Sequence, residues 1–174
     1  MSTNQNLITS ININRTFISR DNNIGIYKYN DNDDLDYVNK ISNINIYEKS
    51  IIPSKMLLSE LDTKMYILPE YTSNKVYTMD LEYGKIVNDW QAFEEMNIRN
   101  IHQNTKYSQL TPDSCILGIN NNSIFQMDHR LNGRNKMTFK YTYQNSPGIQ
   151  CIASTINGEV VIGDKKGEIR LYKD

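Results

Sequence analysis

One strand-like pattern recurs along this chain, and the spacing of its copies limits the folds that the chain can adopt. In each copy a β-branched residue begins a short run in which apolar side chains alternate with others. The copies begin at Ile26, Val76, Ile124 and Ile169, at intervals of 50, 48 and 45 residues. Repeats of about 40 to 50 residues, each holding a four-stranded sheet, are typical of propeller blades. A β-sandwich without internal repeats is the alternative that the same strands allow.

Turn residues divide each unit into short strands. The strands predicted for the four units are, in order, residues 7–13, 16–19, 24–29 and 37–41; 55–59, 64–68, 75–81 and 85–90; 107–110, 115–119, 123–128 and 136–143; and 150–154, 159–162 and 168–172. We therefore predict one all-β domain over residues 1–174, a portion of an antiparallel β-propeller with about four blades at 5–50, 51–97, 98–146 and 147–174. The last blade lacks its outer strand, so we expect an incomplete ring.

Stacking of the blades predicts which side chains are buried. A single sheet cannot bury both of its faces alone, so neighbouring blades pack face to face. We expect the four residues that begin the copies to be buried between blades, and larger residues beside them, Tyr77, Met79, Phe125 and Met127, to fill the wider spaces further out. An unpaired edge at 168–172 and an open face at each end predict that the rest of the propeller, or self-association, covers them.

The clearest hairpin lies between Asn74 and Trp90. Its two strands are joined at Glu82, Tyr83 and Gly84, where we expect Gly84 to adopt the positive φ of a tight turn. Trp90 closes the hairpin and is predicted to pack between blades rather than to bind a partner.

Composition excludes several classes of partner. The chain of 174 residues holds 19 basic and 20 acidic residues, for a net charge of −1. Such a balance favours neither nucleic acid nor an anionic membrane. No apolar run is long enough to span a membrane, and no secretory signal opens the sequence, so we expect a soluble cytoplasmic protein without membrane insertion. The two cysteines, Cys115 and Cys151, are then expected to be buried free thiols.

Few residues are arranged for catalysis or metal binding. The acidic loop Asp31–Asp36 fails the calcium-loop pattern, because Asp36 and Ser42 stand where glycine and glutamate are needed. His102 and His129 have no second ligand at zinc spacing. Neither a nucleophile elbow nor a phosphate-binding loop is present. We predict no catalytic residue, no metal site and no cofactor.

One basic turn is a candidate for binding an acidic or phosphorylated peptide. Residues 130–136 hold Arg130, Arg134 and Lys136 within a few positions. Guanidinium groups bind carboxylates and phosphates in two-pronged hydrogen bonds. A solvated connection between strands is the alternative interpretation of this segment.

The segment Tyr77-Thr78-Met79-Asp80-Leu81-Glu82-Tyr83-Gly84-Lys85-Ile86-Val87 resembles a hallmark of the vacuolar import and degradation protein twenty-seven family, within its C-terminal WD-repeat-like domain. Further similar stretches lie at 15–20, 24–28, 41–44, 125–131 and 167–172. The resemblance implies a WD-repeat-like propeller that acts as a non-catalytic protein-interaction scaffold, linked to turnover of cytosolic proteins or to vesicle traffic to the vacuole. The family's domain normally continues for about as many residues again, so we expect this chain to be its N-terminal half.

The resemblance also separates structural from binding residues. Asp80, Leu81, Gly84 and Trp90 form the structural signature. The segment around them carries more than a repeat requires, so Glu82, Tyr83 and Lys85 are the expected contacts for a protein or peptide partner, together with Arg130 and Arg134. Two other interpretations remain open at this stage: a propeller enzyme whose site lies in the missing half, and a degenerate gene fragment.

Overall fold

The regular structure of the described residues consists of β-strands alone. The computed structural model describes residues 5–9, 16–20, 23–32, 34–41, 44–46, 49–50, 52–59, 63–69, 74–91, 98–103, 115–120, 122–128, 137–142, 148–155 and 157–173. Turns rich in asparagine, aspartate and glycine end the strands, as expected for residues that tolerate turn conformations. No helix in the described part of the chain is long and apolar enough to cross a membrane.

Four antiparallel sheets follow one another along the chain. The first contains β1 (Gln5–Thr9), β2 (Thr16–Arg20), β3 (Asn23–Tyr29) and β4 (Leu35–Ile41). The second contains β7 (Pro53–Leu58), β8 (Lys64–Pro69), β9 (Lys75–Asp80) and β10 (Lys85–Gln91). The third contains β11 (Asn100–Gln103), β12 (Cys115–Asn120), β13 (Ser123–Asp128) and β14 (Met137–Thr142). The fourth contains β15 (Ile149–Ser154), β16 (Val160–Asp164) and β17 (Ile169–Tyr172), and a short hairpin of β5 (Asn45–Ile46) and β6 (Lys49–Ser50) joins the first two sheets.

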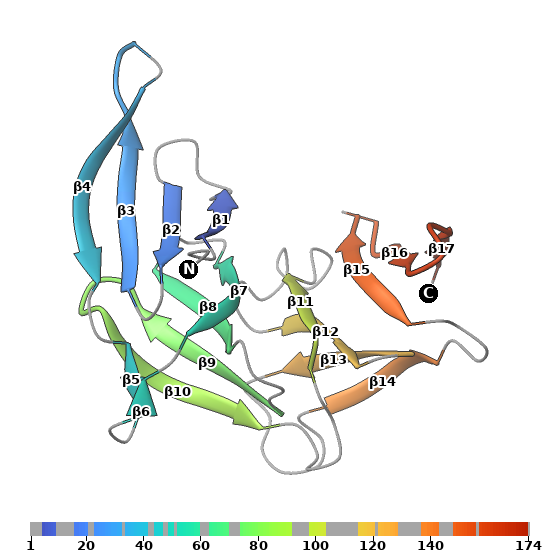
Figure 1. Ribbon diagram of the computed structural model, residues 1–174. Helices are drawn as coiled ribbons and strands as arrows, with labels where there is room; N and C mark the ends of the chain where they lie inside the picture. The colour runs from blue at the N-terminus through green and yellow to red at the C-terminus, as the bar shows by residue number, and fades with distance from the viewer. Residues whose placement is uncertain are drawn as a thin grey trace.

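The sheets lie side by side with their first strands innermost (Figure 1). Strand β7 contacts both β1 and β11, and β11 contacts β15, so the first strand of each sheet is adjacent to the first strand of the next. This is the arrangement of propeller blades around an axis. The predicted all-β propeller class is confirmed, with three strands in the last sheet, and the described sheets do not close a ring. The blade boundaries assigned from sequence stay a prediction.

Apolar side chains fill the space between the first and second sheets. Phe17 and Ile24 of the first sheet pack in one cluster with Met65, Ile67 and Met79 of the second, and all five are at most 1% exposed. Alternation along the strands places these residues on the facing surfaces. Full burial of each such side chain contributes roughly 1.5–3 kcal/mol, so this interface ties the first two sheets together.

Two further clusters continue the stack. Tyr66 and Val76 of the second sheet pack with Phe125 and Met127 of the third. Ile124, on the opposite face of the same β13 strand, packs with residues of the fourth sheet, among them Ile152 and Ile162. Each of the first three sheets thus presents one apolar face to the sheet that follows it.

The four residues that begin the repeat copies were expected to be buried, and this is confirmed for Val76 and Ile124, partly met at Ile26 and wrong for Ile169. Val76 and Ile124 are fully buried, and Ile26 is half-buried against the first cluster. Ile169 is 78% exposed. It lies on the face of the fourth sheet that is turned away from the third, because its neighbours Arg170 and Tyr172 lie opposite Ile162 and Val160, which face the third sheet. No described element covers the face that holds Ile169.

The same uncovered face explains a second wrong prediction. Cys151 is a free thiol, as expected, but it is exposed rather than buried. A register shift between Ile149 and Cys151 places Cys151 opposite Gly163, which in turn pairs with Ile169. The side-chain surroundings of Cys115 lie outside the described residues.

The first strand of the third sheet is also displaced from its predicted position. Strand β12 pairs with β13 on one side and with β11, residues 100–103, on the other. The position predicted for residues 107–110 is therefore taken by β11, and 107–110 lie outside the described residues. Only Ile101 of β11 is an apolar residue that enters a core cluster, so the short strand lacks the alternation that would have marked it.

Candidate protein-interaction site

The turn Asp80–Lys85 connects β9 to β10 and holds three of the five residues expected to contact a partner. Asp80 is the last residue of β9, and its Oδ1 accepts hydrogen bonds from the backbone N–H of Glu82 at 2.9 Å and of Tyr83 at 3.2 Å. An aspartate that bonds to the backbone two and three residues ahead fixes a turn. The side chain of Asp80, the first residue of the turn, therefore fixes the backbone of the turn.

Leu81 attaches this turn to the sheets in two ways. The N–H of Leu81 donates a hydrogen bond of 3.0 Å to the carbonyl of Thr63. Leu81 also packs against the cluster between the first two sheets. Lys85 pairs with Asp80, so Leu81 to Gly84 form a loop one residue longer than expected.

Gly84 has the positive φ expected for it, at 63°. A side chain is disfavoured there, and a Cβ would also lie 3.4 Å from Cγ2 of Ile41, at the end of β4. The turn of the second sheet thus rests against the first sheet. Ile41 and Thr63 were not singled out from the sequence, because their contacts with the turn are long-range and leave no local signal.

The remaining side chains of the turn face solvent. Tyr83 is 69% exposed, and Glu82 and Lys85 are also exposed. Val87, a residue skipped in the register between β9 and β10, adds an exposed apolar side chain next to the turn. An aromatic ring with charges of both signs is held here on a fixed backbone.

The structure does not describe the side chains of the other predicted partner contacts or of Trp90. Arg130 and Arg134 lie outside the described residues, as does His129. The backbone of Trp90 pairs with Val76 in the β9–β10 ladder, while the packing of its side chain lies outside what is described. The partner contacts expected at Arg130 and Arg134 stay predictions.

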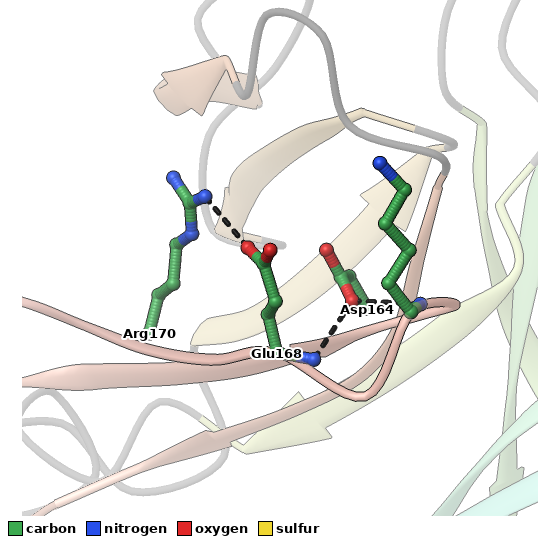
Figure 2. Close-up of polar contacts among 4 residues, drawn as sticks. Asp164, Glu168 and Arg170 are labelled. Carbon is green, nitrogen blue, oxygen red and sulfur yellow. Dashed lines mark hydrogen bonds and ion pairs between the residues drawn. The ribbon is translucent and has the colours of Figure 1, made fainter.

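A second turn with the same chemistry connects β16 to β17 (Figure 2). Oδ1 of Asp164 accepts hydrogen bonds from the N–H groups of Lys166 at 2.8 Å and Glu168 at 3.0 Å, and Glu168 forms an ion pair of 2.8 Å with Arg170. Gly167 has a φ of 84°. A turn between the strands predicted at 159–162 and 168–172 is confirmed, and the structure adds that Asp164, a buried residue three positions before a glycine, fixes it. Its side chain positions the backbone and is not available to bind a partner.

Two other ion pairs involve partly or fully exposed charges. Lys173 Nζ lies 2.8 Å from Oε1 of Glu159, and Lys75 Nζ lies 2.8 Å from Oδ2 of Asp89. The hydrogen bond from Lys173 lowers the pKa of the Glu159 carboxyl, and the same contact raises the pKa of the Lys173 ammonium. Within the described residues, no three His, Cys, Asp or Glu side chains gather in a way that could hold a metal ion.

Comparison with known proteins identifies relatives of the chain. The sequence is 35% identical over 173 residues to vacuolar import and degradation protein 27 of Saccharomyces cerevisiae and 31% identical over 160 residues to the protein of that name in Schizosaccharomyces pombe. These matches cover 97% and 91% of this chain but 22% and 20% of the relatives. The chain therefore spans about a fifth of the length of these relatives.

Solved structures with the same arrangement of sheets are WD40 propellers or contain similar folds. The WD40 propeller domain of Doa1 matches 98% of this chain and 50% of its own with a TM-score of 0.62, at 11% identity. Raptor of Chaetomium thermophilum matches 97% of this chain and 15% of its own with a TM-score of 0.66, at 10% identity. A chain of the mitotic checkpoint complex gives a TM-score of 0.63 over 92% of this chain and 43% of its own, at 10% identity. Identities this low show the fold alone.

The sequence model of the VID27 C-terminal WD40-like domain matches residues 2–174. This match, the two yeast relatives and the propeller arrangement of the sheets agree with the resemblance carried by residues 77–87. The chain belongs to the VID27 family and corresponds to its C-terminal WD40-like domain.

Proposed function

We propose that this chain is a non-catalytic protein-interaction module, and that a protein or peptide partner binds at the Asp80–Lys85 turn. The observation that carries the proposal is the 69% exposure of Tyr83 on a backbone fixed by hydrogen bonds to Asp80 and Thr63. Tyrosine is frequent among the residues that dominate binding energy, because its ring buries a large apolar area and its hydroxyl can still bond. A fixed turn loses little conformational entropy when it binds.

Charges beside the ring give the contact an orientation. Glu82 and Lys85 are exposed on either side of Tyr83 and Gly84 and carry opposite charges. A partner with complementary charges binds in one direction, and a reversed pattern is repelled. Arg130 and Arg134, which lie outside the described residues, are proposed on their residue type alone to bind an acidic or phosphorylated segment of a partner.

The family supports a cellular role for the module. The WD40-like fold is commonly used to hold protein partners, and both yeast relatives are named for vacuolar import and degradation. The module acts in the cytoplasm, in the turnover of cytosolic proteins or in vesicle traffic to the vacuole. The rest of a propeller, or self-association, covers the open face of the fourth sheet that holds Ile169 and Leu171.

Affinity capture with matched variants tests this function. The chain, Tyr83→Ala, and the double charge reversal Glu82→Lys/Lys85→Glu are used as baits in extracts of cells that contain the family, and bound proteins are quantified by mass spectrometry. Tyr83→Phe and Lys166→Glu, on the β16–β17 turn, serve as controls. We expect at least one protein to bind the chain and both controls and to be lost with Tyr83→Ala and the charge reversal, because loss of a hot-spot ring costs about 2 kcal/mol or more.

Two results would contradict the proposal. An unchanged set of bound proteins for the folded Tyr83→Ala and charge-reversal variants would remove the turn as the binding site. Turnover of a substrate by the purified chain would replace the scaffold function by an enzymatic one. The cellular role is measured separately, as a longer half-life of the captured protein when cells express Tyr83→Ala in place of the chain.

A further inference from the structure

The β3–β4 hairpin extends beyond the rest of the first sheet. Strand β2 pairs with β3 only as far as Tyr27, whereas β3 and β4 continue to pair as far as Tyr29 and Leu35. Figure 1 shows this hairpin reaching past the other strands of its sheet. Stacking between blades uses the four-stranded part of a sheet, which ends at Tyr27, so Tyr29 and Leu35 stay accessible when a neighbouring sheet covers that part.

One face of the β3–β4 hairpin is aromatic from the last four-stranded rung, at Tyr27, to the extension. Ile24 and Ile26 pack toward the second sheet, so alternation places Tyr27 and Tyr29 on the opposite face. Across the ladder, Tyr37 lies opposite Tyr27 and Leu35 lies opposite Tyr29. These four residues form what we call the tyrosine face.

Three of the four residues of the tyrosine face are exposed, and two of its rings pack together. The rings of Tyr27 and Tyr37 meet edge to face, with their centroids 5.7 Å apart and an angle of 72° between their planes. Tyr29, Leu35 and Tyr37 are 50%, 41% and 59% exposed. Large side chains that remain in solvent on an ordered strand pair are a common feature of binding surfaces.

A structured acidic loop adjoins this face. Oδ1 of Asn30 accepts hydrogen bonds from the N–H of Asn32 at 2.9 Å and of Asp34 at 3.0 Å, and the N–H of Asn30 donates to the carbonyl of Asp34 at 2.9 Å. Asp31 and Asp34 are both exposed in this loop. The cation on the same face of the ladder is Lys40, opposite Gly25, at the end away from the loop. Lys28, next to Tyr29, alternates to the opposite face across from Asp36, so Asp31 and Asp34 give the loop end of the tyrosine face a negative charge.

We propose that the tyrosine face and the carboxylates of Asp31 and Asp34 bind an arginine-bearing segment of a partner protein. A guanidinium group is planar, so it stacks on a tyrosine ring and donates paired hydrogen bonds to a carboxylate. An ammonium group matches this combination less well, because it is compact and strongly hydrated. An acidic segment is repelled. The site is separate from the Asp80–Lys85 turn, and either site can exist without the other.

A titration with a defined peptide tests the proposal. The probe is a fluorescein-labelled peptide with four arginines separated by Gly-Ser pairs, and its anisotropy is measured as the 174-residue chain is added. We expect Tyr29→Ala/Tyr37→Ala to weaken binding at least tenfold and Tyr29→Phe/Tyr37→Phe to change it less than twofold. Asp31→Asn/Asp34→Asn should weaken it at least threefold and reduce its salt dependence. A peptide with lysine at the four positions should bind at least threefold more weakly.

Controls separate this site from the proposed interaction turn. Tyr83→Ala should bind the arginine peptide as tightly as the unaltered chain does. Circular dichroism should show that all variants keep their strand content, because the changed side chains are exposed. The proposal is overturned if the chain does not bind the peptide, if Tyr29→Ala/Tyr37→Ala binds it normally, or if the lysine peptide binds equally well. Equal binding of the two peptides would mean charge attraction without recognition of arginine.

Discussion

Replacement of Gly118 by alanine is expected to destabilise the chain through one buried ring. Gly118 in β12 lies opposite Phe125 in β13, and a Cβ at position 118 would stand 2.8 Å from both Cε2 and Cζ of that ring. Carbon atoms in contact normally lie about 3.5–4.0 Å apart, so the ring would have to move by roughly 1 Å. Phe125 is fully buried between the second and third sheets, where it packs with Tyr66 and Met127. Overpacking of a buried core of this kind costs about 1–3 kcal/mol.

The backbone offsets part of this cost. Alanine in a strand interior is favoured over glycine by about 0.5–1 kcal/mol. The net loss in the free energy of unfolding for Gly118→Ala should then be about 1 kcal/mol, and at most about 2.5 kcal/mol, which urea denaturation resolves as a lower midpoint at unchanged slope. In a Phe125→Leu background the ring is gone, so the same alanine should cost less than about 0.5 kcal/mol.

A second glycine provides the matched control. A Cβ at Gly25 would also lie 2.8 Å from a tyrosine ring, that of Tyr27, but this ring is half-buried on the tyrosine face and can rotate outward. Gly25→Ala should therefore change stability by less than about 0.5 kcal/mol. Equal costs for Gly118→Ala in the otherwise unaltered chain and in the Phe125→Leu background would refute the packing of Phe125 against β12.

Three further perturbations test other parts of the structure. Gly84→Ala should lower the free energy of unfolding by about 1–2 kcal/mol more than a surface substitution, since φ of Gly84 is 63° and Ile41 lies against it. Urea denaturation measures this loss, and an unchanged free energy of unfolding would contradict the turn geometry. Ile169→Ser should keep the melting temperature within about 2 °C of that of the unaltered chain and increase solubility, because this side chain is 78% exposed and no described element packs on it. A large fall in the melting temperature would mean that Ile169 is buried. The Glu159–Lys173 pair should stabilise the chain most at intermediate pH. Its contribution is lost as pH falls through the lowered pKa of Glu159, below 4.5, and as pH rises through the raised pKa of Lys173, above 10.5. The melting temperatures of the chain and of Lys173→Met should therefore differ most at intermediate pH and become equal at both extremes of pH.

Local patterns were sufficient to predict most strands and the propeller class. Turn residues separate the alternating runs in the first, second and fourth sheets, and the hairpin around Gly84 has the turn conformation expected from a glycine at that position. Strand β11 was missed because a short inner strand with one core residue, Ile101, has no periodic pattern to detect. Local periodicity identifies a strand only when enough of its side chains alternate between two environments.

Burial of particular faces required information that local sequence does not hold. Alternation along β15 and β17 places Cys151 and Ile169 on one face, but it does not say whether another sheet covers that face. For the interaction turn, the sequence indicated the exposed residues Glu82, Tyr83 and Lys85, while the contacts of Thr63 and Ile41 that hold the turn depend on tertiary packing. The alternation of Tyr27 and Tyr29 is visible in the sequence, but the exposure of Tyr29 depends on where the β2–β3 ladder ends, at Tyr27.

Amide hydrogen exchange of the chain, alone and with the protein captured through Tyr83, tests the interaction module most directly. Partner binding should slow exchange of the backbone amides of residues 81–87 at least tenfold, since a partner seated on this turn excludes water from it. The Tyr83→Ala chain should show no such slowing at the same partner concentration. Protection that spares residues 81–87 and appears elsewhere on the described sheets would contradict the assignment of this turn as the binding site.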